Sequence, residues 1–360
     1  MLRSTQFGFL ISAAALLASA QTLHTNIDLG GKDSPIVVVH YDDGDSKVTQ
    51  RGGAYLVDFH PALTLRNSSS KRIRGVTLLV EALDNSAGGK ASVSIPSLDI
   101  APGDTFPVRI NQTLFGSPSV DVQLDGVLFE DLSFYGPDKL RLQYNMTVWE
   151  LEARQDRKYY KTLLEASGEK ALQNAMIESQ ARQDALALPN VQMARGRSTT
   201  VEAGEDMQFA FLRLPDAPAE LGSGQAKVVA NMADGPSFSI HNVSKRPLRH
   251  LEIGWILKDQ SGREFLAASL PADVNLAPGQ SGQVTEDASL RFRGPGVIQS
   301  MKGFIASAEF SDGSYWIPTR KQLDEPELRG VLAPSPEEQR LTSLYKRKGL
   351  NALIEELKKF

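Results

Sequence analysis

Three aspartates near the start of the chain, Asp42, Asp43 and Asp45, carry the oxygen ligands that Ca²⁺ binds. A calcium loop supplies about six to eight oxygens at a fixed spacing that ends on a distal glutamate, and this chain lacks that spacing. The Asp-Gly step at 43–44 is instead typical of a hairpin turn. We therefore interpret these carboxylates as part of a solvated turn and predict no metal site from them.

Histidine is the other candidate for metal binding, and the chain has five: His24, His40, His60, His241 and His250. None lies in a His-Glu-x-x-His spacing, and the chain has no cysteine to complete a zinc site. His40 and His60 lie in two predicted strands that could converge, but a histidine satisfied within its strand is the simpler interpretation. The sequence thus assigns no metal ligand and no cofactor.

Motifs for nucleophilic catalysis or phosphate binding give no support for an enzyme, since no Gly-x-Ser-x-Gly, Ser-x-x-Lys or Gly-Lys-Ser/Thr pattern stands in a supporting context. Asp131 and Asp312 occupy equivalent turns of two similar segments, which favours turn formation over a catalytic carboxylate pair. Tyr135 and Trp316 follow those turns. An exposed aromatic pair can stack on sugar, but strand aromatics more commonly fill a core. No catalytic residue is assigned, and we predict a protein that is not an enzyme.

A basic cluster near the carboxyl end combines Lys346–Lys348 with Lys358 and Lys359. Clusters that bind anionic lipid generally carry about four to eight basic residues close together. Here the cluster is diluted by Glu337, Glu338, Glu355 and Glu356. We interpret it as a solvated face. A net charge of −4 and a pI near 5.8 likewise give no general attraction to nucleic acid.

One stretch of the chain occurs twice. Asn67 to Asp84 reads NSSSKRIRGVTLLVEALD, and Asn242 to Asp259 reads NVSKRPLRHLEIGWILKD, at an offset of 175 (242 − 67) with no gap. Alternate positions are apolar in both copies, and this period of two predicts a strand with one face on a core. The Asn-x-Ser that begins each copy predicts a turn.

Two further similarities follow in the same order. The Ala-Pro-Gly at 101–103 matches the one at 277–279, at an offset of 176 (277 − 101). The pattern Phe-x-Asp-x-Ser starts at Phe129 and again at Phe310, at an offset of 181 (310 − 129). We infer one module present twice. Two copies are too few for a solenoid, so we expect two globular β modules.

Short apolar runs separated by turn signals predict an antiparallel sandwich in each module. Between the modules the period becomes helical, from about Thr147 to Ala166, with a break at Ser167-Gly168 and a second helix to about Gln183. We therefore predict a mainly β protein with α elements. The expected parts are a signal peptide at 1–20, a first β-sandwich module at 21–146, a helical connector at 147–188, a linker at 189–205, a second module at 206–325 and a C-terminal helical pair at 335–360.

The C-terminal pair has clear local signals. Ser335-Pro336-Glu337-Glu338 predicts a capping box with proline at the first helical position. Gly349 is expected to end the first helix as its C-cap. Both helices carry apolar stripes, made of Leu341, Leu344 and Tyr345, then of Leu350, Leu353, Ile354 and Leu357. We expect these stripes to dock on the protein's own sandwich, with a partner as the alternative.

The segment 1–20 has the pattern of a signal peptide. Arg3 precedes an apolar run at 7–17, and Ala18-Ser19-Ala20 forms a small-x-small cleavage site. The run is too short to span a bilayer comfortably, and no later stretch is long and apolar enough. Export without cysteine is typical of bacterial proteins whose domains need no disulfides. We predict an exported protein, periplasmic or extracellular, with no transmembrane span in the mature chain.

The repeated stretches also resemble a known family. The Asn-x-Ser turn, the alternating strand that ends in Asp84 or Asp259, and the following Ala-Pro-Gly turn resemble the FxLYD-type, immunoglobulin-like modules of exported bacterial proteins. The resemblance covers about Asn67 to Ile110 and Asn242 to Leu290, and the whole chain is similar to exported proteins of soil bacteria such as Acidobacteria. It implies tandem immunoglobulin-like sandwiches with a binding or structural role, and it supplies no catalytic residues.

The leading functional hypothesis is therefore a non-enzymatic exported protein that binds or scaffolds a protein or an envelope polymer. A second hypothesis is a hydrolase, or a hydrolase accessory protein, with a site between the two modules, because loops of both modules contain Asp, His and aromatic residues. A third is self-assembly through the helix at 147–183, although its apolar positions hold no clean heptad. The oligomeric state stays open.

Overall fold

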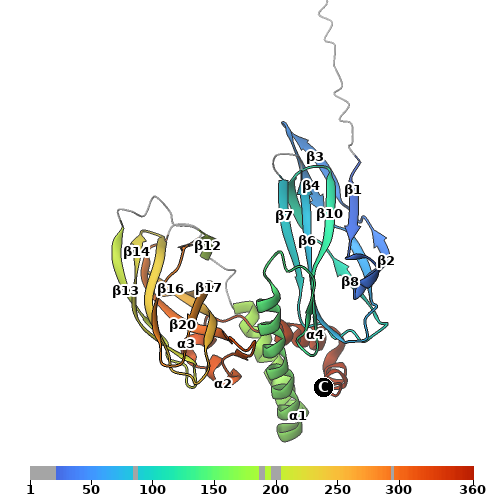
Figure 1. The fold of residues 1–360 in the computed structure, drawn as a ribbon. Coiled ribbons are helices and arrows are strands. Elements are labelled where there is room, and N and C mark those ends of the chain that lie inside the picture. Colours follow the sequence, from blue (N-terminus) through green and yellow to red (C-terminus); the bar gives the residue numbers. More distant parts are fainter. Residues whose placement is uncertain (1–21, 84–87, 186–190, 196–203, 293–295) are drawn as a thin grey trace, which may run out of the picture. The chain divides into compact units, whose positions relative to one another are not determined.

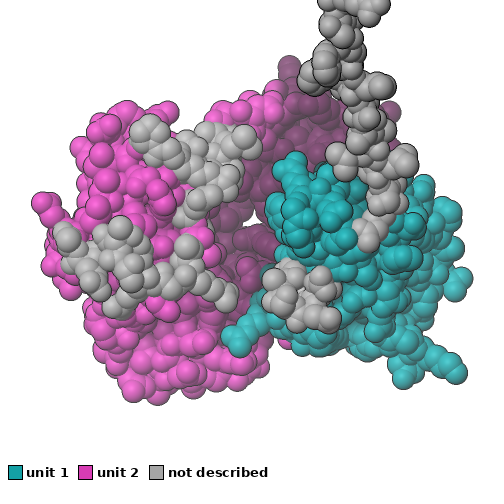
Figure 2. All heavy atoms as spheres, turned by 90° about the horizontal axis from the view of Figure 1, so that it is seen from above, with its two compact units in different colours: residues 1–142 teal, residues 143–360 magenta. Residues whose placement is uncertain are grey.

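The computed structural model describes residues 22–83, 88–185, 191–195, 204–292 and 296–360 (Figure 1). The predicted signal peptide lies outside the described residues. The chain divides into two compact units, residues 1–142 and 143–360, which Figure 2 shows in two colours. Strands dominate both, so the expectation of a mainly β protein is confirmed. Within the described residues, no helix has the length and apolar character needed to cross a membrane.

Unit 1 is built from three sheets with strand orders β1-β10-β6-β7, β2-β5-β8 and β3-β4-β9, and β11 pairs with β10. The strands are β1 (His24–Asp28), β2 (Ile36–Asp42), β3 (Lys47–Arg51), β4 (Ala54–Phe59), β5 (Ala62–Asn67), β6 (Ile73–Leu83), β7 (Gly88–Ile95), β8 (Thr105–Arg109), β9 (Gln112–Gly116), β10 (Ser119–Phe129) and β11 (Phe134–Tyr135), with a 3-10 turn at Gly31–Asp33.

Unit 2 contains one extended sheet with the order β12-β19-β15-β14-β13-β20-β16-β17, to which β18 and β21 are added at β15 and β20. Its elements are α1 (Gln143–Ala185), β12 (Val191–Arg195), β13 (Glu205–Phe211), β14 (Ala219–Val229), β15 (Met232–Asn242), β16 (Leu248–Asp259), β17 (Glu264–Leu276), β18 (Ser281–Thr285), β19 (Ala288–Phe292), β20 (Ile298–Phe310), β21 (Tyr315–Trp316), α2 (Arg320–Leu323), α3 (Pro326–Arg329) and α4 (Pro336–Leu357).

The two copies of the repeated stretch have equivalent neighbours in the sheets. β6 lies between β10 and β7, and β16 lies between β20 and β17, with antiparallel pairing throughout. The two-residue strand β11 pairs with β10, and its counterpart β21 pairs with β20. The alternating apolar side chains face the two cores, where Val76, Leu78 and Trp255 are completely buried.

Each unit also contains a parallel pair, which corrects the expectation of purely antiparallel sheets. β1 runs parallel to β10, and β13 runs parallel to β20. These partners are far apart in the chain, so no short hairpin requires them to run in opposite directions. The pairing therefore follows from how the unit packs, which the local sequence pattern does not report.

The Asn-x-Ser turns of the two copies make the same hydrogen bonds. The side-chain amides of Asn67 and Asn242 each donate to the carbonyl four residues on, at 2.8 and 2.9 Å, and to the carbonyls of Ile100 and Leu276, at 3.1 and 2.9 Å. Their side-chain oxygens each accept from the backbone and hydroxyl of the serine two residues on, at 3.0 and 2.7 Å in both turns. Both asparagines are completely buried, so each turn is anchored from inside.

The helices α1 and α4 pack against each other in unit 2. Their shared core contains Tyr160, Leu172 and Met176 from α1 with Leu341, Leu353 and Leu357 from α4, all buried. Taken in chain order, each α1 residue and its α4 counterpart are separated by 181 positions (341 − 160, 353 − 172, 357 − 176). This is the same offset as between the Phe-x-Asp-x-Ser patterns. The repeat in the sequence therefore continues into the helices.

A glycine interrupts both of these helices. α1 breaks at Gly168 and α4 breaks at Gly349, the two positions at which the sequence predicted one helix to end and a second to follow. The apolar stripes of α4 dock on α1, whereas we expected them to dock on a sandwich. Helix α1 carries an apolar stripe of its own, and packing the two helices together buries both stripes. The predicted linker is also partly strand, since 191–195 forms β12 and pairs with β19.

A candidate binding pocket in the second unit

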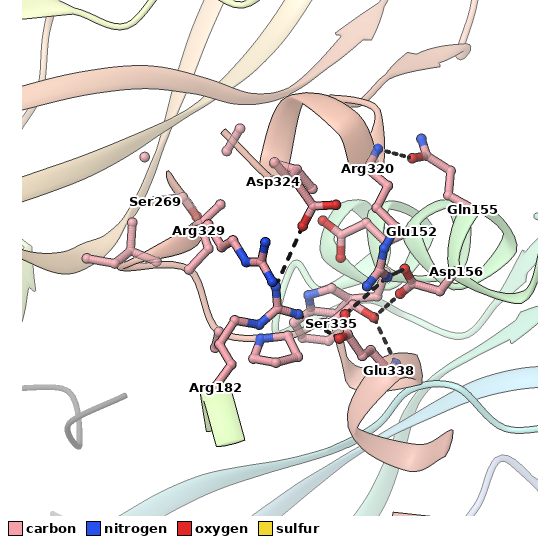
Figure 3. A pocket seen from close by; sticks show the side chains of 18 of the residues that line it. Glu152, Gln155, Asp156, Arg182, Ser269, Arg320, Asp324, Arg329, Ser335 and Glu338 are labelled. Atoms are coloured by element: carbon pink, nitrogen blue, oxygen red, sulfur yellow. Dashed lines mark hydrogen bonds and ion pairs between the residues drawn. The ribbon is translucent and has the colours of Figure 1, made fainter. Parts of the chain in front are cut away.

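A pocket of about 280 Å³ lies on the face of β16, β17 and β20 that is turned away from the main core of unit 2 (Figure 3). Helix α1 forms one wall, and the segment from α2 to the start of α4 forms the other. The larger apolar side chains of the lining are Trp149, Leu266, Phe304, Leu323 and Leu332. Deeper in this layer, Ile256, Leu328 and Val331 are buried with Phe304 and fix the segment 323–332 against the sheet.

The floor of the pocket depends on a glycine. Gly254 on β16 is the cross-strand partner of Phe304 on β20 and of Ser269 on β17. A Cβ added at Gly254 would lie 2.4 Å from the Phe304 ring, so the ring packs against the strand only because position 254 has no side chain. The exposed Ser269 lies at the rim.

Arg320 connects the two walls. Its guanidinium forms ion pairs with Asp156 on α1 and with Glu338 on α4, the latter at 3.1 Å, and donates to the Tyr160 hydroxyl at 3.0 Å. The same group lies over the rings of Tyr159 and Tyr160, 4.3 and 4.9 Å from their centroids. Burial raises the pKa of Asp156, against the opposing effect of Arg320.

Glu338 accepts from two guanidinium groups. Arg182 donates to its Oε1 at 2.6 Å and also lies 3.7 Å from Asp324. Burial opposes ionisation of Glu338, but Arg320, the Ser179 hydroxyl and Arg182 together outweigh it, so its pKa is lowered. The predicted capping box is therefore half formed. The Ser335 hydroxyl accepts from the Glu338 backbone at 3.0 Å as an N-cap, while the Glu338 carboxylate turns to the arginines.

Among the carboxyl groups that line the pocket, Glu152 takes no part in the ion pairs of Arg182 and Arg320. It lies one turn before Asp156 on α1 and lines the pocket, and among the described residues it has no hydrogen bond or ion pair (Figure 3). Burial, and then the charge of Asp156, raise its pKa to about 7. A partly buried carboxyl without a counter-ion thus faces a lining of apolar and aromatic side chains.

The residues singled out in the sequence lie elsewhere. In the Asp42–Asp45 turn, Asp42 accepts from the Gly44 backbone at 3.0 Å, and Asp45 lies 3.1 Å from His60. Across the described ranges, no group of three or more His, Asp or Glu side chains is arranged to hold a metal ion. His40 lies on β2, as predicted for a strand, whereas His60 follows β4 and lies outside it, with no bond between the two among the described interactions.

The paired turn residues act structurally. Asp131 and Asp312 each accept from the backbone of the serine two residues on, at 3.0 Å in both turns. Lys71 also donates to Asp131 at 2.7 Å, and its ammonium, with the Ser133 hydroxyl, lowers the Asp131 pKa. The aromatic residues that follow, Tyr135 and Trp316, are partly buried and pack against the two main cores.

A second polar cluster, only partly buried, lies around His250, outside the pocket. The His250 ring lies 2.8 Å from Asp273, 3.8 Å from Glu252 and edge-on to Tyr144. Burial, and then the nearby Glu252, raise the pKa of Glu286 to about 7. This cluster lines none of the described pockets.

Sequence reasoning identified no residue of the pocket as a site residue. Its charged side chains come from α1 and from the segment 320–338, and only the folding of unit 2 brings these together. The single local signal was the Ser335 cap, which points to a helix start and carries no information about Arg182 or Arg320. No spacing rule links carboxylates and guanidinium groups so far apart in the chain.

No family model matches the chain, and no curated protein matches it. Among solved structures it is similar to a β-glucosidase from Kluyveromyces marxianus in complex with glucose, at 9% identity over 78% of this chain and 47% of that chain, with a TM-score of 0.18. It is also similar to red sea bream transglutaminase (10% identity, 76% and 31% covered, TM-score 0.13) and to an allantoicase (11% identity, 75% and 84% covered, TM-score 0.11). TM-scores this low carry no argument about activity.

Proposed function

We propose that this protein is a non-enzymatic, exported binding or scaffold protein built from two copies of one immunoglobulin-like, FxLYD-type β-sandwich module, and that the pocket of unit 2 is its ligand site. The equivalent neighbours of β6 and β16, and the matching bonds of Asn67 and Asn242, support the duplication. The signal-peptide pattern of the segment 1–20 supports export. A protein or an envelope polymer remains the expected partner.

One observation carries the binding role. The terminal guanidinium nitrogens of Arg320 and Arg182 are already bonded to Asp156, Tyr160 and Glu338, or paired with Asp324. These groups therefore form a fixed frame around the cavity, and Glu152 stands out as a group available to a ligand. Concave pockets with an apolar lining and a few fixed polar groups are the usual form of a small-molecule site.

Blocking the pocket tests this role. Ser269 is exposed at the rim, so Ser269→Trp should obstruct the cavity with little cost to the fold. Thermal-shift screening of the mature protein against a small-molecule library should give ligands that raise the melting temperature of the wild type and not of Ser269→Trp. The matched control is Arg291→Trp, at an exposed position of β19 outside the pocket, which should respond like the wild type. Ligands that stabilise all three proteins equally would place binding elsewhere.

A hydrolase is the competing proposal, and the pKa of Glu152 near 7 is the observation that favours it, since a general acid works best near the ambient pH. Its neighbour Asp156 is engaged by Arg320 and Ser335 and so is poorly placed to act as a partner base. Turnover of a glycoside, ester or peptide substrate that Glu152→Gln abolishes would favour this proposal over the binding role.

A further inference from the structure

We propose that the pocket binds an organic cation, an ammonium or guanidinium group on an apolar stem, with Glu152 as its counter-ion. This inference rests on the proposed function of the pocket as a ligand site and names the class of ligand that it takes.

The charged side chains that line the pocket carry an excess of negative charge. Arg329 at the rim is paired with Glu178 at 2.7 Å, which leaves Arg182 and Arg320 as the other cations of the lining. These two groups are shared among three carboxylates, Asp156, Asp324 and Glu338. With Glu152 added, the ionised lining has more negative than positive charges, and a bound cation would restore the balance.

Glu152 lines the same cavity as two aromatic side chains. Trp149 precedes it by three residues on α1, so both side chains leave the helix on the same face and line the same cavity. Phe304 lies across the floor. A carboxylate beside aromatic rings in a partly desolvated cavity is the arrangement that receives ammonium and guanidinium heads. The aliphatic lining from Leu266, Leu323 and Leu332 suits a methylene stem.

An anionic ligand fits the same surroundings poorly. The buried Nε atoms of Arg182 and Arg320 have no partner among the described residues, but they have almost no exposed surface. The outer guanidinium nitrogens are engaged by Asp156, Asp324, Glu338 and Tyr160. An anion would have to break these pairs and would then lie beside Glu152. The carboxyl of Glu152 therefore favours a ligand with a positive charge.

Calorimetric titration of the mature wild-type protein at pH 8 tests the proposal with four probes: hexylamine, 1,6-diaminohexane, hexanol and hexanoate. The two amines should bind at least about tenfold more tightly than hexanol, with no binding of hexanoate. A lysine-containing peptide in a further titration separates the two sources of such a cation: preference for the peptide points to a side chain of a protein partner, and preference for the free amine points to a small metabolite. Tighter binding of hexanoate or hexanol than of the amines would overturn the proposal, as would no binding of any amine.

Substitution at Glu152 gives an independent result. Glu152→Gln keeps the shape and removes the charge, so it should weaken amine binding about tenfold or more, while Glu165→Gln, at an exposed position of the same helix, should leave it unchanged. Equal amine binding by Glu152→Gln and the wild type would overturn the cation proposal. If library ligands were then still lost in Ser269→Trp, the pocket would remain a ligand site of another chemistry, so the two proposals fail separately.

Discussion

Gly168 and Gly349 break the two long helices of this protein with nearly the same backbone geometry, φ 78° and ψ −178° in α1, φ 82° and ψ −178° in α4. Their numbers differ by 181 (349 − 168), the offset that also relates Tyr160 to Leu341 in the core between these helices. The backbone therefore departs from the helix in the same way at both glycines. Corresponding residues of the two helices meet in one shared core.

Alanine at either glycine should destabilise the protein by about 1–3 kcal/mol, because this region of φ and ψ is strained for any residue with a Cβ. A Cβ at either position meets no atom within 4 Å, so the loss reflects backbone strain and not a clash. Urea denaturation measures it. Gly330→Ala is the control, since Gly330 has a φ of −73° and ordinary space, and it should leave the stability unchanged or raise it by up to about 1 kcal/mol. Equal effects of all three substitutions would refute the strain argument.

Loss of Arg320 should cost more than loss of an exposed arginine. Arg320→Met leaves Asp156 and Glu338 buried without that partner, and removing one member of a buried ion-pair network costs about 3–5 kcal/mol. Arg329→Met is the control, because Arg329 and Glu178 are 44% and 68% exposed and such a surface pair is worth at most about 1 kcal/mol. Chemical denaturation at pH 7 compares the two variants, and similar losses would mean that the pocket network contributes no more than a surface pair.

The buried asparagines of the two turns should matter equally. Asn67→Ala and Asn242→Ala each remove two donated and two accepted hydrogen bonds at a completely buried position, with an expected loss of about 2–4 kcal/mol. Hydrogen-exchange mass spectrometry should show lower protection around the substituted turn. Asn26→Ala, which removes one exposed bond to Asp121, should have little effect. A large loss in one turn and none in the other would argue against equivalent roles.

Stability should fall as the pH rises from about 4.5 to 7, in part because of Glu152. Its pKa is about 7 in the folded protein, against an ordinary value of 4.5, so the folded state binds the proton more tightly than the unfolded chain does. The resulting stabilisation is complete below about pH 4.5 and is lost as the pH passes through 7, by at most about 1.4 kcal/mol per pH unit. The pKa of Glu286 is also raised, so its contribution to stability likewise decreases as the pH rises.

Glu152→Gln removes the contribution of Glu152 to this pH dependence. The variant should therefore lose less stability than the wild type between pH 5 and pH 8. Thermal or urea unfolding at several pH values measures the difference between the two proteins, which cancels the contributions of groups they share. Glu165→Gln serves as the matched control and should reproduce the wild-type profile. Parallel profiles for the wild type and Glu152→Gln would contradict the raised pKa.

Local sequence was enough for features that depend on neighbours along the chain. The period of two from Val76 to Ala82 predicted β6, and the Asn-x-Ser that starts at Asn67 predicted its turn. Gly168 predicted the break in α1, and Ser335 predicted the start of α4. At each of these positions, side-chain period or backbone preference acts within a few residues, so the tertiary structure has little to add.

Features set by distant contacts were missed. The apolar stripes of α4 were expected to dock on a sandwich, but they pack against α1. The pairing of β12 with β19 likewise makes a strand of residues 191–195, where composition suggested a linker. In both places a partner from another part of the chain provides the stabilising contacts, and local composition does not record it.

The sequence by itself determined the repeated strand, its turn and the sites of helix start and break, because hydrophobic period and backbone preference are properties of adjacent residues. Only the tertiary structure decided that Glu152 faces a cavity without a counter-ion among the described residues, while Arg320 joins Asp156 to Glu338. The physical reason is that electrostatic and packing interactions depend on distance in space. That distance becomes short only once α1, the sheet and α4 have packed together.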